Sequence, residues 1–247
     1  MYRWGIGPDY DAAVLSAALW AGLAASFLLL GAWLGVVREA TSRTTGLVMG
    51  FGAGALIASV SFELTEDAFE RGGGIPLAIG LALGALTYFV GDLAIDRIGP
   101  TGARGDTGLA LLMGAALDGL PESLIIGLTL GLGGSLEVAF FVSVAVSNLP
   151  EGFASAASQH QAGEATRTIM LRWLVVVVAS AVFGLIGFAL YDALSPTAVA
   201  FTQAFAAGAL LTMVMDTMAP EAFKDAGPTT GLIAVAGFAG AFFLSVR

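Results

Sequence analysis

Two apolar stretches of the chain each place a glutamate directly after a proline and add other oxygen-bearing side chains one turn earlier. The first stretch reads DGLPES and carries Asp118 and Glu122, and the second reads SNLPEG and carries Ser147, Asn148 and Glu151. Side chains three or four residues apart share one face of a helix, so the polar groups of each stretch point the same way. Carboxylate, amide and hydroxyl oxygens grouped like this suit a divalent cation. The spacing therefore indicates a metal site built from these five residues.

The two prolines add backbone oxygen atoms to this set. Pro121 cannot donate a hydrogen bond to the carbonyl group of Leu117, and Pro150 cannot donate one to that of Val146. Both carbonyl groups lie one turn before a glutamate. A structural interpretation stays open for the smaller polar side chains, because single Asn and Ser residues in membrane helices often make packing hydrogen bonds. These side chains are Ser123, Ser147 and Asn148.

The composition is that of an integral membrane protein. Hydrophobic residues make up 57% of the 247 residues and charged residues only 12%, against about 45–50% and about 25% in soluble domains. Apolar runs recur, each close to the ~20 residues that cross a bilayer as a helix, so the expected fold class is an all-α membrane protein. The absence of cysteine excludes thiolate sites, and the single histidine excludes a histidine cluster. The net charge of −9 argues against nucleic acid as a partner.

Breaks between the apolar runs predict eight transmembrane helices in a single domain, residues 1–247. They cover approximately 13–37, 45–69, 75–97, 107–132, 135–157, 168–192, 197–222 and 228–246. An even number of spans leaves both termini on one side. Most basic residues fall in or beside the connections after the first, third, fifth and seventh spans, so the positive-inside bias places both termini outside a cell membrane. These basic residues are Arg38, Arg43, Arg97, Arg104, Arg167, Arg172 and Lys224.

The motif carboxylates are expected near the middle of the bilayer. Asp118 is about twelve residues into its span, or ~18 Å along a helix that rises ~1.5 Å per residue. A charge at that depth costs at least ~2.5–3.5 kcal/mol on insertion scales. Lys and Arg are not expected there, so salt bridges cannot compensate the charge. Protonation, water in a cavity and a bound cation remain, and the shared faces of the polar side chains favour the cation.

Residues 51–69 and 205–223 form an internal repeat. The sequences FGAGALIASVSFELTEDAF and FAAGALLTMVMDTMAPEAF align without gaps and match at eight of nineteen positions. In the eight-span topology the two copies run in opposite directions, which predicts an inverted repeat of helices 1–3 and 6–8 around a central pair of helices 4 and 5. Inverted repeats around helices broken by Pro or Gly are typical of transporters. Shared small residues at helix contacts are the alternative explanation.

Other acidic residues are candidates for a cation path. Four crowd the outer end of the second span, where they either raise the local cation concentration or form a solvated acidic helix end. These are Glu63, Glu66, Asp67 and Glu70. Toward the inner side, the seventh span carries Asp216 and Glu221, of which Asp216 is the deeper. The remaining titratable residues on this side are Asp92, Asp96 and His160, the last expected at the surface.

Together the motifs resemble those of the ZIP (Zrt/Irt-like protein) family of divalent metal transporters, of bacterial or archaeal type. The resemblance rests on the eight spans with outside termini, on the paired Pro-Glu motifs, and on the stretch from Asp216 to Glu221 that follows AAGAL in the seventh span. The AGAL stretch after Phe51 is similar to the family's second span. The resemblance implies that Glu122 matches the family's bridging glutamate and that Glu151 is its counterpart.

Several positions depart from the family pattern. Members typically read His-Asn-x-Pro-Glu-Gly in the fourth span, where this chain has Asp118 and Gly119 at the first two positions. The sixth span has no acid before Asp192, whereas many members add a glutamate there for a second metal site. The resemblance therefore implies one metal site rather than two. It also implies a ligand set without imidazole, the softer ligand.

These observations predict a carrier that moves a divalent cation toward the cytoplasm by alternating access. The ion is zinc or a related transition metal such as Mn, Fe or Cd; it is the transported substrate, and no cofactor is expected. The expected partners are divalent metal ions and the lipid bilayer, with a homodimer as one assembly. A metal-sensing or structural subunit that does not transport is the alternative. An enzyme or an ATP-driven pump is not expected, because the sequence shows no His-Glu-x-x-His motif, catalytic Ser motif or P-loop.

Overall fold

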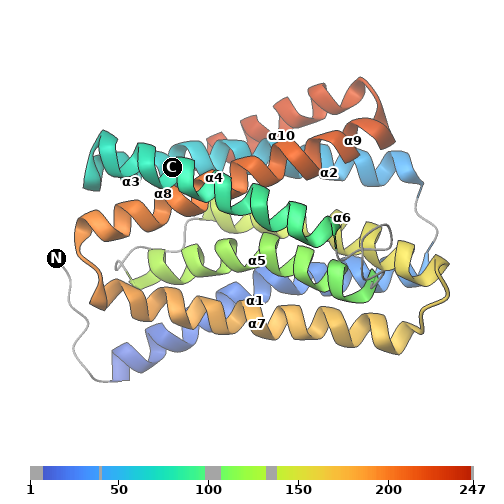
Figure 1. The fold of residues 1–247 in the computed structure, drawn as a ribbon, viewed down its shortest axis with the longest axis horizontal. Helices are drawn as coiled ribbons and strands as arrows, with labels where there is room; N and C mark the ends of the chain where they lie inside the picture. The colour runs from blue at the N-terminus through green and yellow to red at the C-terminus, as the bar shows by residue number, and fades with distance from the viewer. Residues whose placement is uncertain (1–7, 39–40, 98–106, 132–137, 246–247) are drawn as a thin grey trace.

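The computed structural model describes residues 8–38, 41–97, 107–131 and 138–245, and the regular elements in these ranges are all helices (Figure 1). Some side chains within the ranges lie outside the description, including those of Asp96, Asp118 and Asp192. For the described part of the chain, the predicted all-α fold class is confirmed.

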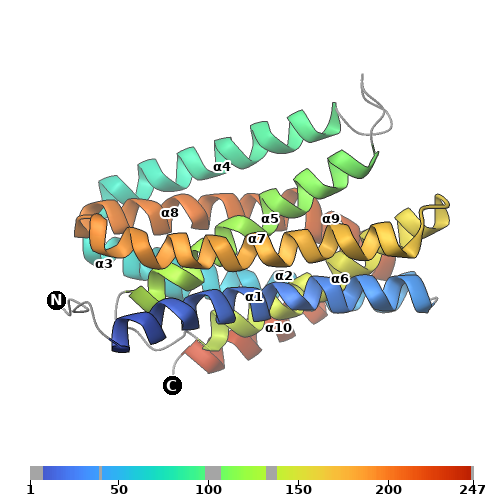
Figure 2. The ribbon, with the colours of Figure 1, turned by 90° about the horizontal axis from the view of Figure 1, so that it is seen from below.

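The helices form eight rods that lie side by side along the long axis of the molecule (Figures 1 and 2). Two rods each consist of three consecutive helical segments. One joins α2 (Ser42–Ser59), a π-helical segment (Val60–Thr65) and α3 (Glu66–Gly72), and the other joins α8 (Pro196–Met213), a π-helical segment (Val214–Met218) and α9 (Ala219–Ala226). The other rods are α1 (Pro8–Val37), α4 (Gly74–Asp96), α5 (Thr107–Gly131), α6 (Val138–Gln161), α7 (Thr166–Ala193) and α10 (Thr229–Ser245). These bounds match the eight predicted helices to within a few residues.

Five rods are long and apolar enough to cross a membrane, judged by length and composition over the described residues. They are Asp11–Val37, Ser42–Gly72, Gly74–Ile95, Thr166–Tyr191 and Pro196–Ala226; Gly119–Gly131 and Thr229–Ser245 are shorter apolar helices. The rod α6 is not among the five, and its sequence is interrupted by polar residues such as Asn148, Glu151 and Gln159. The chain is a multi-pass membrane protein, and eight full crossings remain a prediction for α5, α6 and α10.

The two rods that consist of three segments begin and end alike. Thr41 caps α2 and Ser195 caps α8, each side chain accepting a hydrogen bond of 3.3 Å from the backbone amide three residues later. Such caps satisfy amide groups that the first helical turn leaves without partners. At the far ends, Gly73 and Gly227 have φ angles of 74° and 65°, which only glycine adopts at little cost. Each rod therefore stops at a glycine turn that reverses the chain into the next helix.

Close packing divides the rods into two groups. In the first group, α1 packs along α6 and α7, and α5 packs along α7. In the second group, α4 packs along α8, and α10 packs along α2. The groups meet chiefly where α2 lies against α6, and there the buried hydroxyl groups of Ser59 and Ser143 are joined by a hydrogen bond of 2.9 Å. Both motif helices, α5 and α6, belong to the first group.

Over their described residues, α5 and α6 do not form the closely packed central pair that the sequence predicted. They touch over a small area, while α5 packs mainly on α7 and α6 mainly on α1. The helices that their glycines face explain the difference. A Cβ atom on Gly127 of α5 would fall 1.9 Å from the carbonyl oxygen of Gly184 in α7, and one on Gly152 of α6 would fall 2.1 Å from that of Leu28 in α1. Small residues set the closest approach of membrane helices, so these glycines bring the motif helices to different partners.

Replacement of Gly127 by alanine should destabilise the bundle. The added methyl group would overlap the α7 backbone, and overpacking of this kind typically costs about 1–3 kcal/mol. The melting temperature of the purified protein in detergent should therefore fall. The matched control is Gly231→Ala, which should leave it unchanged or slightly higher, because a Cβ atom there has nothing within 4 Å. Equal melting temperatures for Gly127→Ala and the wild type would contradict the close approach of α5 and α7.

Candidate metal centre

The glutamate of the first motif is buried. Glu122 has 2% of its surface exposed and lies in α5 directly after Pro121, through which the helix continues. One turn of this region is reinforced by Ser123, whose hydroxyl group donates a hydrogen bond of 2.8 Å to the carbonyl oxygen of Gly119. The sequence of α5 contains neither Lys nor Arg. A carboxylate is thus held within an apolar helix, where its ionised form needs compensation.

The two smaller polar residues of the second motif both have packing roles. Ser147 and Asn148 are 0% and 3% exposed. The Ser147 hydroxyl group donates to the carbonyl oxygen of Val144 in its own helix, and the Asn148 Nδ2 atom donates to that of Ala24 in α1, each at 3.0 Å. Asn148 therefore ties α6 to α1 by a buried hydrogen bond. Its amide oxygen is a separate acceptor and is the atom through which it would bind a cation.

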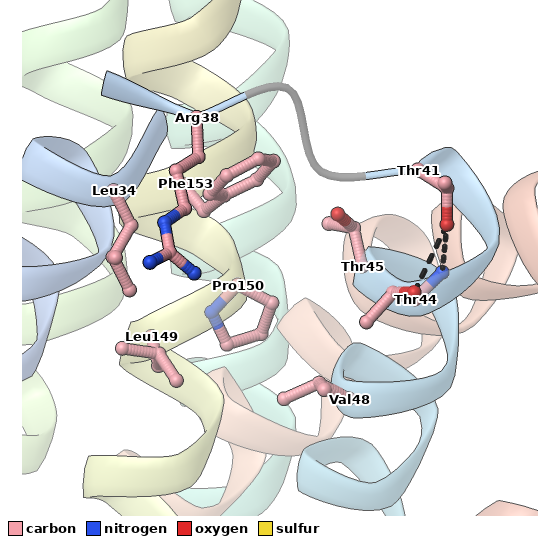
Figure 3. A pocket seen from close by; sticks show the side chains of 9 residues that line it. All are labelled: Leu34, Arg38, Thr41, Thr44, Thr45, Val48, Leu149, Pro150 and Phe153. Carbon is pink, nitrogen blue, oxygen red and sulfur yellow. Dashed lines mark hydrogen bonds between the residues drawn. The ribbon is translucent and has the colours of Figure 1, made fainter. Parts of the chain in front are cut away.

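The glutamate of the second motif lies near the boundary between the two helix groups. Glu151 is half-buried on α6, one turn after Ser147 and on the same face. The helix α2 comes close to this face, because a Cβ atom on Gly52 would lie 3.0 Å from the Cα atom of Ser147. On another side of α6, Pro150 lines a cavity of about 360 Å³ between α1 and α2 (Figure 3). The second motif is thus packed against α2 on one side and borders a cavity on another.

The structure describes the side chains of only part of the predicted ligand set. Among the described side chains, no group of three or more His, Asp or Glu residues is arranged to hold a metal ion. Asp118, the third predicted carboxylate, has its backbone in α5, but its side chain lies outside the described residues. The five-residue site therefore stays a prediction, and the burial of Glu122, Ser147 and Asn148 supports it.

The acidic residues at the outer end of the second rod have different surroundings. Asp67 accepts hydrogen bonds from Arg71 at 2.6 Å and from the buried Gln203 of α8 at 2.7 Å. The bond from Gln203 gives Asp67 a structural role, since it joins α3 to α8. Glu63 is half-buried and accepts a hydrogen bond of 2.7 Å from Ser245 of α10. The remaining two acids, Glu66 and Glu70, are exposed.

The inner acidic residues do not gather at one point in the described structure. Asp216 and Glu221 are both exposed, Asp216 within the second π-helical segment and Glu221 in α9. Asp92 of α4 is half-buried, and the Asp96 side chain lies outside the description. His160 is exposed near the end of α6, as expected. A path role for Glu63, Asp216 and Glu221 remains a prediction.

The two π-helical segments were not expected from the sequence. In the alignment of 51–69 with 205–223, Val60 stands opposite Val214, and these two residues begin the two segments. A π-helical turn is rare and frequently marks a functional site. The repeat alignment contained a signal for these segments. The two copies are identical at Val60 and Val214 and match again at Ala68 and Ala222, but they share no identity at the seven positions between. The unmatched positions coincide with the segments.

No family model matches the chain. The chain is 26% identical, over 207 residues, to an Arabidopsis thaliana protein named "putative zinc transporter". The match covers 77% of this chain and 32% of that protein, so the chain spans about a third of the length of the relative it matches. This similarity supports a relation to zinc transporters, in agreement with the multi-pass helical architecture.

Replacement of Asn148 by leucine should weaken the contact between α6 and α1. It removes the donor to the Ala24 carbonyl oxygen, and a buried polar group left without its partner costs about 1–3 kcal/mol. The melting temperature in detergent should fall. Ser123→Ala serves as the control with a small expected effect, because its hydrogen bond lies within one helix. A larger loss for Ser123→Ala than for Asn148→Leu would show that Asn148 does not tie the two helices together.

Proposed function

We propose that the protein is a ZIP-like carrier that moves a divalent metal cation toward the cytoplasm by alternating access. The observation that carries the proposal is the burial of Glu122, a carboxylate with 2% of its surface exposed in an apolar helix without Lys or Arg. A carboxylate in such surroundings is costly in its ionised form, and a cation in transit compensates it. Two ion pairs of the described residues, Arg71–Asp67 and Arg172–Glu164, lie near the ends of rods.

In this proposal Glu122 and Glu151 bind the ion where α5 and α6 approach each other. Asp118 and Asn148 complete the ligand shell, with Ser147 as a further oxygen ligand. Carboxylate and amide oxygens suit Mn²⁺ and Fe²⁺ and also bind Zn²⁺. The name of the Arabidopsis relative favours zinc among these ions. The metal is the cargo of a carrier, and the proposal includes no chemical reaction.

The internal repeat supports alternating access. Both α2 and α8 are 18 residues long, and each runs into a π-helical segment at matching positions of the alignment. The packing also repeats. The contact of α1 with α6 corresponds to that of α7 with α5, and the contact of α4 with α8 corresponds to that of α10 with α2. Two copies of one unit in opposite orientations can exchange two arrangements, one open to each side of the membrane.

The distribution of basic residues supports the inward direction. In Figure 1 the first turn of α1 and the last turn of α10 lie at the same end of the bundle. Arg38 and Arg43 flank the connection at the opposite end, between α1 and α2, and Lys224 lies in α9, after most of the seventh rod. The positive-inside bias assigns that basic end to the cytoplasm and the termini to the outside.

Replacement of either motif glutamate by glutamine should abolish most metal uptake. Glutamine keeps the size of the side chain but removes the charge that binds the ion. Loss of a residue that merely supports a metal ligand costs about 10–100-fold, so the loss of a ligand should cost at least that much. Uptake of Zn²⁺, Mn²⁺, Fe²⁺, Co²⁺ or Cd²⁺ into proteoliposomes measures the effect for Glu122→Gln and Glu151→Gln.

The matched control for this experiment is Asp11→Asn, which makes the same change from carboxylate to amide at an exposed residue near the start of α1 and should transport at the wild-type rate. Wild-type uptake by Glu122→Gln would refute the site. Vesicles with wild-type protein that take up none of the five ions would refute transport itself and would favour the non-transporting subunit.

Uptake should also decrease as the pH falls equally on both sides of the vesicle membrane. Carboxylate ligands must lose their protons before they bind a metal ion, so protons compete with the metal for the same oxygen atoms. Initial rates at a fixed free metal concentration, from neutral to mildly acidic pH, measure this competition. A rate that is independent of pH, or that rises on acidification, would contradict carboxylate ligation.

A further inference from the structure

A crevice of about 360 Å³ opens between the end of α1, the start of α2 and the middle of α6, and the predicted metal ligands are not part of its lining. Its deep wall is apolar: Leu34, Val48 and Leu149 are half-buried, and Pro150 is buried. Threonine hydroxyl groups and the exposed Arg38 lie at its mouth. Figure 3 shows the Arg38 side chain extending beside Leu34 toward the deep wall. The crevice therefore combines apolar walls with one guanidinium group.

A larger, more polar cavity of about 840 Å³ adjoins the crevice at this end of the bundle. The two cavities share Arg38, Thr45 and Phe153. The larger one adds the ammonium group of Lys224 and the carboxylate of Asp225, and the exposed His160 also lies on its wall. Arg38 and Lys224 together outweigh Asp225 in charge, so the basin formed by the larger cavity favours an anion.

The lining of the crevice does not suit the transported cation. Among the described residues it includes no carboxylate, and most of its wall is apolar. The Arg38 guanidinium group repels a divalent cation at short range. The combination of a hydrocarbon slot and a cationic mouth instead matches a molecule with an anionic head and an apolar tail, and the bilayer around the protein supplies such molecules.

We propose that the crevice and the basin bind one anionic phospholipid, with an acyl chain against Pro150 and the phosphate group between Arg38 and Lys224. Arg38 directly follows the last residue of α1, so the phosphate lies at the level where lipid headgroups are found. The slot runs from there into the bundle along Leu34 and Val48, which gives the acyl chain the direction it has in the bilayer. Basic pockets between helices on the cytoplasmic side are known to bind anionic headgroups.

A second apolar crevice provides a comparison within the same molecule. It has a volume of about 480 Å³, lies between α4, α5, α7 and α8, and is lined by the other motif proline, Pro121. Val48 of the first crevice and Thr202 of the second stand at matching positions when the repeat alignment is extended. Among the described residues, the lining of the second crevice includes neither Lys nor Arg. An acyl chain fits either crevice, but only the first offers a counter-charge for a headgroup, so selectivity for anionic lipid belongs to the first.

Photolabelling of the purified full-length chain in lipid vesicles tests this site. Phosphatidylglycerol and phosphatidylcholine probes, each with a photoreactive group on one acyl chain, are compared at equal mole fraction, and labelled peptides of α6 around Pro150 are quantified. The phosphatidylglycerol probe should label them about fivefold more strongly, the effect expected of the one net positive charge that Arg38, Lys224 and Asp225 together present to an anionic lipid. Arg38→Gln should remove this preference, while Arg38→Lys, which keeps the charge, should retain most of it.

The matched control is Arg43→Gln, because Arg43 is exposed nearby in α2 but lines neither cavity, and it should keep the preference. Equal labelling by the two probes in the wild type, or an undiminished preference in Arg38→Gln, would overturn the proposal. Displacement of the phosphatidylglycerol probe by excess inorganic phosphate would overturn it as well, since it would assign the basin to free phosphate. The labelling uses no metal, so its outcome is independent of the transport experiments.

Discussion

Burial of carboxyl groups inside an apolar bundle is the constraint on which the rest of this structure depends. Glu122 is 2% exposed and Glu151 is half-buried, on two helices whose sequences contain neither Lys nor Arg. The hydrocarbon layer supplies no hydrogen bonds, so the protein or its cargo must compensate every polar group placed there. Asn148 does so with a hydrogen bond to the Ala24 carbonyl oxygen. For the carboxylates we propose compensation by the transported cation, which binds and is then released.

The helices around the motifs belong to two groups that meet along one boundary. Both motif helices belong to one group of rods, which meets the other group mainly between α6 and α2. The two apolar crevices that reach the motif prolines, Pro121 and Pro150, both lie between the groups. The second group contains both π-helical segments, at matching positions of the repeat. We propose that the two groups move against each other at this boundary.

Local sequence signals predicted the rods to within a few residues, because hydropathy marks their apolar length and the charged or Gly/Pro-rich breaks mark their ends. The partners of each rod could not be read in this way. The sequence suggested that α5 and α6 pack closely because they are adjacent along the chain, but Gly127 and Gly152 bring them to α7 and α1 instead. Burial of Glu122 followed from its apolar surroundings. The roles of Asp67 and Arg38 did not, since a hydrogen bond to α8 and the lining of a cavity both depend on residues distant in sequence.

Anomalous scattering from crystals soaked in Zn²⁺ or Mn²⁺ tests the central claim most directly, because it identifies the ion and its ligands together. We expect one peak between α5 and α6, with carboxylate oxygens of Glu122 and Glu151 at about 2.0–2.2 Å from zinc. A structure in which no ion binds there, with Glu122 and Glu151 turned toward lipid or fully bonded to protein donors, would contradict it.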